Sequence, residues 1–115
     1  MVTGAGAEAL RYARAAVESA AADGISVRHR VKSELVLAAA LCAVGEPDES
    51  RKVADRVLTA TEQWELVPLR WAVASLLSSI GSGVHPPGEL HLIRDQAADL
   101  VRRRGGAFFD WRPPG

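Results

Sequence analysis

Prolines and glycines divide this chain into five stretches in which apolar residues recur every three or four positions. That spacing places apolar side chains on one face of an α-helix, and proline and glycine interrupt helices most strongly. The predicted helices cover residues 7–22, 27–44, a stretch that begins at Pro47, 68–80 and 87–104. No run of alternating β-branched residues predicts a strand. We therefore expect an all-α fold, with residues 1–6 as a flexible start and 105–115 as a tail.

The composition excludes several classes of protein. Lysine plus arginine and aspartate plus glutamate both number 14, so the net charge is zero and no basic field favours nucleic acid or membranes. The apolar run VLAAALCAV at 36–44 is too short for a membrane span of about 18 residues. The first ten residues lack the pattern of a signal peptide, and a single cysteine excludes an internal disulfide. We therefore expect one cytoplasmic domain over residues 1–115, which by itself binds neither nucleic acid nor membrane.

The predicted helices also repeat along the chain. An offset of 36 positions aligns Gly45 with Gly81, and an offset of 40 positions aligns Pro47 with Pro87. A period in the upper thirties, with two helices in each unit, is typical of α-solenoids. The second helix, which contains LVLAAALCAV, is apolar on nearly all sides and is expected to be buried between neighbours, with Ser26 capping its start.

Several positions of these units resemble the tetratricopeptide family. Residues 8–17, EALRYARAAV, are similar to the second helix of such a repeat, with Ala9, Ala13 and Ala16 at its small-residue positions. In the next units the resemblance is carried by Leu37, Ala38, Leu41, Gly45, Ser50, Ala54, Val57 and Leu58, then by Val73, Ala74, Leu77, Gly81, Arg94, Ala97 and Ala98. It covers about residues 7–104 and implies a tetratricopeptide-like array of about five helices.

The joint TEQWELVPLRWAVASLL, residues 61–77, looks most like the sensor regions of large bacterial LuxR-type transcription regulators. Glu65 stands where that joint usually has glycine. Pro68 suits the first turn of a helix, where its missing N–H is not needed. Trp64 ends the apolar stripe of the preceding helix and is expected to fill the core, as is Leu76 in the next helix.

Trp71 has a different expected role. The resemblance places it where family members point a side chain into the concave groove, and Leu35 falls at the same place 36 positions earlier. We therefore predict a partner-binding groove; the alternative is that Trp71 packs between repeats. The residues predicted to line the groove are Leu35, Ala39, Trp71, Ser75 and Ser78, with Cys42 one turn beyond Ala39.

The segment VRHRVK, residues 27–32, places three cations at the start of a helix, where the helix dipole disfavours positive charge. Exposed N–H groups and nearby cations suit an acidic ligand or a phosphate, so Arg28, Arg30 and Lys32 are candidate anion contacts. The alternative is a solvated turn whose charges pair with Asp23 or Glu34.

No catalytic constellation is recognisable in the sequence. The histidines His29, His85 and His91 lack the spacing of metal ligands, and Cys42 lies in an apolar helix. GAGAEA and GSGVHPPG lack residues that a dinucleotide or phosphate loop requires. We therefore expect no metal, no cofactor and no enzymatic activity.

The tail GGAFFDWRPPG is rich in aromatics, which disordered tails usually lack. Phe108, Phe109 and Trp111 are therefore expected either to cover the last helix or to dock on another chain. Only about two and a half repeat units are present, whereas solenoids usually need three or more. This predicts a homodimer, or docking on a larger partner, through helix 7–22 or the tail.

These features together favour a regulatory module that binds a protein or peptide. The alternative is a segment of a bacterial transcription regulator that holds a small molecule in its groove.

Overall fold

The computed structural model describes residues 4–22 and 26–104 of the chain, and within them it contains five α-helices and no strand. The all-α prediction is therefore confirmed. The helices are α1 (Gly4–Ala22), α2 (Val27–Ala43), α3 (Pro47–Gln63), α4 (Val67–Ile80) and α5 (Pro87–Arg103).

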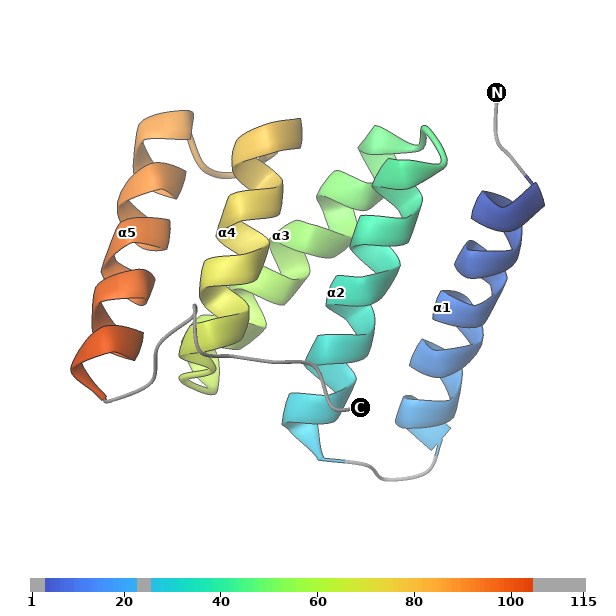
Figure 1. Ribbon diagram of the computed structural model, residues 1–115, viewed down its shortest axis with the longest axis horizontal. Coiled ribbons are helices and arrows are strands. Elements are labelled where there is room, and N and C mark those ends of the chain that lie inside the picture. The colour runs from blue at the N-terminus through green and yellow to red at the C-terminus, as the bar shows by residue number, and fades with distance from the viewer. Residues whose placement is uncertain (1–3, 23–25, 105–115) are drawn as a thin grey trace.

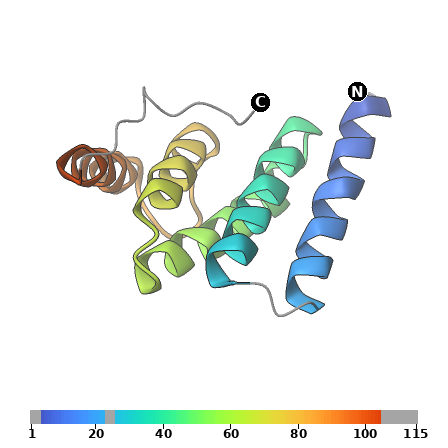
Figure 2. The same cartoon turned by 60° about the horizontal axis from the view of Figure 1, so that its bottom comes forward.

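The helices form an array in which neighbours in sequence pack against each other. Helices α2 and α4 lie side by side and are in direct contact, with α1 beyond α2 and α5 beyond α4 (Figure 1). Helix α3 crosses behind α2 and α4, so that it forms a second layer, which Figure 2 shows after the molecule is tilted. The arrangement is compatible with a helical-hairpin repeat.

The ends of the helices follow from their local sequence. Ser26 caps α2, because its Oγ accepts a hydrogen bond from the backbone N–H of His29 over 3.3 Å, as predicted. Pro47 and Pro87 occupy the first positions of α3 and α5, where their missing N–H leaves no partner unsatisfied. Asp48 lies in the first turn of α3, where the helix dipole favours negative charge.

Helix α1 begins three residues earlier than the predicted boundary, at Gly4 instead of residue 7. Glycine is a poor helix former, but adding a residue to an existing helix costs far less than nucleating one. The alanine-rich sequence that follows supplies the nucleus, and the helix therefore extends through Gly4 and Gly6.

Two joints of the array share one backbone geometry. After α2, the N–H groups of Gly45 and Glu46 donate to the carbonyl oxygens of Cys42 and Leu41 over 3.2 and 2.9 Å. After α3, the N–H groups of Glu65 and Leu66 donate in the same pattern to Glu62 and Thr61 over 3.4 and 2.9 Å. Each is a Schellman ending, which requires a left-handed residue. That residue is Gly45, with φ of 82°, in the first joint and Glu65, with φ of 52°, in the second.

The core lies where α3 meets α2 and α4, and it extends between α4 and α5. Leu41, Val57, Leu77 and Leu90 each have an exposed fraction of 1% or less. Ser50 is also fully buried, and its Oγ donates a 2.6 Å hydrogen bond to the carbonyl oxygen of Ala38, which ties α3 to α2. This bond satisfies the one polar group that Ser50 brings into the core.

Two of the predicted core residues are less buried than expected. Trp64 is 51% exposed, because it is the C-cap residue of α3 and lies beyond the part of the stripe that meets α2 and α4. Leu76 is only partly buried, at the margin of the core, whereas its neighbour Leu77 is completely enclosed. The prediction for Trp64 is therefore wrong, and that for Leu76 holds only in part.

None of the helices among the described residues is long and apolar enough to cross a membrane.

Candidate functional site

The five residues predicted to line a groove lie on the two helices that contact each other directly, α2 and α4. Leu35 and Ala39 belong to α2, and Trp71, Ser75 and Ser78 belong to α4. Leu35 and Trp71 lie 36 positions apart, at the offset that aligns the sequence of α2 with that of α4. Ala39 is exposed and the other four are partly buried, so Trp71 is neither fully enclosed nor fully in solvent.

The two serines of this set direct their protons to their own helix. Ser75 Oγ donates to the carbonyl oxygen of Trp71 over 2.9 Å, and Ser78 Oγ donates to that of Ala74 over 2.8 Å. Their hydroxyl oxygens keep lone pairs that can accept hydrogen bonds. Each serine hydroxyl can therefore accept a hydrogen bond from another molecule, whereas its own proton is already used in the bond to α4.

The face of α2 carries further apolar surface that the sequence reasoning missed. The missed residues are Val36, which is 51% exposed, and Ala43, which is exposed on the same side of the helix as the predicted Ala39. An exposed apolar strip is a common feature of interaction sites. The sequence does contain a signal for this strip, because residues 35–44 are apolar on all sides of the helix. The neighbouring helices do not cover every side of α2, so one apolar side remains exposed.

The three candidate anion contacts do not converge on one place. Arg28 and Lys32 are four residues apart and share a side of α2, whereas Arg30 points to nearly the opposite side at 3.6 residues per turn. All three side chains are exposed. Ser26 already accepts the N–H of His29 at this helix end. Of the two proposed acidic partners, Asp23 lies outside the described residues, and Glu34 lies 3.9 Å from Arg56 on α3.

An open pocket of about 240 Å³ lies between α1, α2 and α3, on residues that the sequence did not single out as a set. Its apolar lining comes from Val17, Val27, Val31 and Ala60, all of which are buried or packed against the core. The remaining lining residues are the exposed Trp64 and two charged residues of α2, Arg30 and Glu34. None of these residues belongs to the predicted α2–α4 groove.

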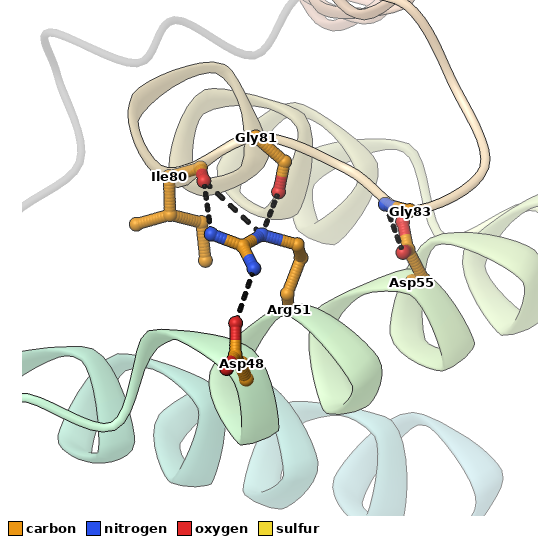
Figure 3. Close-up of polar contacts among 6 residues, drawn as sticks. All are labelled: Asp48, Arg51, Asp55, Ile80, Gly81 and Gly83. Atoms are coloured by element: carbon orange, nitrogen blue, oxygen red, sulfur yellow. Dashed lines mark hydrogen bonds and ion pairs between the residues drawn. The ribbon is translucent and has the colours of Figure 1, made fainter.

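The α4–α5 loop, which the sequence marked only as a spacer, is fixed by two side chains of α3 (Figure 3). Arg51 donates from Nη2 and Nε to the carbonyl oxygen of Ile80 over 2.9 and 3.2 Å, and from Nε to that of Gly81 over 3.1 Å. Asp55 accepts from the N–H of Gly83 over 2.9 Å and from Ser82 Oγ over 2.6 Å. We call this set of contacts the α3 clamp. Its bonds all lie within the chain and hold the α4–α5 loop against α3, so we assign it a structural role.

Other candidates are dispersed or lie outside the described part of the chain. Phe108, Phe109 and Trp111 are outside the described residues. Cys42 is partly buried and has no disulfide partner in the described ranges. Within residues 4–22 and 26–104, no group of three histidine, cysteine, aspartate or glutamate side chains is arranged to hold a metal ion.

No protein-family model matches the chain, and searches among curated proteins and solved structures find no similar protein. The assignment of function therefore depends on the geometry described above.

Proposed function

We propose that the chain is a non-enzymatic, tetratricopeptide-like module that binds a protein or peptide on the face of α2 and α4. The observation that supports this proposal most directly is the exposed apolar strip of α2, where Val36 is 51% exposed next to Ala39. Helix α4, in contact with α2, adds the partly buried indole of Trp71. Tryptophan is strongly enriched among residues that dominate binding energies.

A peptide helix or extended segment would cover the apolar strip and place one apolar side chain against Trp71. Ser75 and Ser78 would accept hydrogen bonds from that segment, since their own protons are engaged. A regulatory role, as in the sensor regions that the α3–α4 joint resembles, belongs to this proposal. So does a homodimer, in which the partner is a second copy of the chain.

Peptides selected from a displayed random library on the full chain test this proposal. A selected peptide should shift the backbone NMR resonances of Leu35, Ala39 and Trp71, and Trp71→Ala should weaken its binding by about tenfold or more. Val36→Asp should also weaken binding while leaving stability nearly unchanged, because Val36 is exposed.

The matched control is Val84→Asp, which changes a 71% exposed valine on the α4–α5 loop and should leave binding unaffected. If selected peptides shift resonances elsewhere, or if Val36→Asp binds them as the parent does, the α2–α4 face is not the binding surface.

A further inference from the structure

The indole of Trp64 lies outside the hydrophobic core. It is 51% exposed at the end of α3 and lines the pocket between α1, α2 and α3. An indole at the edge of an apolar pocket can cover the apolar part of a bound molecule, because aromatic side chains bury a large area on contact.

The position of Trp64 follows from the Schellman ending of α3 at the next residue. Glu65 has φ of 52°, in the left-handed region, whereas the equivalent residue of the preceding joint is Gly45. This ending of α3 leaves its C-cap residue, Trp64, at the edge of the pocket.

The charges around the pocket decide what it can hold. Glu34 forms a long ion pair with Arg56 of α3, whose Nη2 lies 3.9 Å from the Oε1 of Glu34. Arg30 lies one helical turn before Glu34, yet within the described ranges its guanidinium makes no hydrogen bond or ion pair. Arg30 therefore offers N–H donors that no described residue engages directly, and Glu34, one turn away in the same lining, carries the opposite charge.

The lining also limits the size and character of a ligand. Val17, Val27 and Ala60 pack against the core, so this apolar wall is already formed without a ligand. The volume of about 240 Å³ is smaller than the roughly 300–1,000 Å³ typical of sites for drug-sized molecules. A compact apolar body with one negative group fits these conditions.

We propose that this pocket binds a small carboxylate with a compact aliphatic body. The Arg30 guanidinium binds the carboxylate, since its planar fork of N–H donors matches two carboxylate oxygens. The aliphatic body lies on Val31 and Ala60 and under the indole of Trp64. The site shares no residue with the α2–α4 face, so the test of this proposal is independent of the test of peptide binding on that face.

Titration of the full chain with hexanoate, followed by NMR of backbone and indole N–H groups, tests the proposal. Hexanoate should shift the indole N–H of Trp64, identified by its loss in Trp64→Phe, and should saturate at millimolar concentration. Hexylamine, with the same body and the opposite charge, should bind about tenfold more weakly or not at all.

Two arginines of the same helix provide matched variants. Arg30→Gln should lower hexanoate affinity about tenfold and bring it to the level of hexanol, whereas Arg28→Gln, outside the pocket lining, should leave it unchanged. Both residues are exposed, so neither change should unfold the chain. The proposal is overturned if hexylamine binds as well as hexanoate, if Arg30→Gln has no effect, or if hexanoate leaves Trp64 unshifted.

Discussion

Arg51 caps the C-terminal end of a helix that begins sixteen residues after it: its Nη2 lies 2.9 Å from the carbonyl oxygen of Ile80, the last residue of α4. The last carbonyl groups of a helix have no partner within the helix, and a cation is electrostatically favoured there. Arg51 therefore replaces the basic residues that the last turn of α4 lacks. The contact joins α3 to the end of α4.

Arg51→Met should lower the free energy of unfolding by about 1–3 kcal/mol, because hydrogen bonds from a charged donor to Ile80 and Gly81 are lost. Urea denaturation measures this change. Lys52→Met alters an exposed cation of the same helix and should change stability by less than about 0.5 kcal/mol. Equal effects of the two substitutions would show that the α3 clamp does not stabilise the fold.

Leu77→Ala should destabilise the protein by about 2–5 kcal/mol, since Leu77 is fully enclosed and its truncation leaves a cavity. Leu76→Ala should cost clearly less, because Leu76 is partly exposed and water can fill the space. The two unfolding curves, with Leu92→Ala as the exposed control, rank the three positions. A Leu76→Ala protein that loses as much stability as Leu77→Ala would contradict the observed burial.

Glu65→Gly should stabilise the chain by up to about 1 kcal/mol. The left-handed conformation costs a residue with a side chain about 1–2 kcal/mol, and the greater freedom of glycine in the unfolded chain offsets part of that gain. Gly45→Ala should have the opposite sign, with a loss of about 1 kcal/mol at the equivalent joint. Thermal denaturation of both variants checks the pair, and destabilisation by Glu65→Gly would mean that Glu65 makes a compensating interaction.

Self-association through α1 or the tail remains a prediction. On α1, Ala13 is buried, whereas Ala9 and Ala16 are exposed and available to a second helix. Sedimentation at micromolar concentration should show a dimer that is weakened by Ala16→Glu or by deletion of residues 106–115. Ser79→Glu, on the exposed side of α4, is the control that should leave the dimer intact. A chain that sediments as a monomer before either change has no such interface.

The helix boundaries were predictable because local residues determine them. Pro47 and Pro87 begin helices, Gly45 ends one, and Ser26 caps one, all through contacts within a few residues. The predicted ranges accordingly differ from the observed helices by only a few residues.

The surroundings of individual side chains were harder to predict. Trp64 continues the spacing of the α3 stripe, but spacing does not reveal where the neighbouring helices stop covering it. The contact between Arg51 and Ile80 joins residues 29 positions apart, and nothing near Arg51 in the sequence indicates it. The pocket likewise combines residues of three helices, so it becomes visible only once their packing is known.

The α3 clamp also bears on how the chain unfolds. In an array held together by stacking alone, the terminal hairpin can fray while the remainder stays folded. Here Asp55 holds the N–H of Gly83, and Arg51 holds the end of α4, so separating the last hairpin from α3 breaks polar bonds as well as apolar contacts. Helices α3, α4 and α5 should therefore melt as one cooperative unit, and its extent is set by two ionic side chains of α3 instead of by the pairing of helices into hairpins.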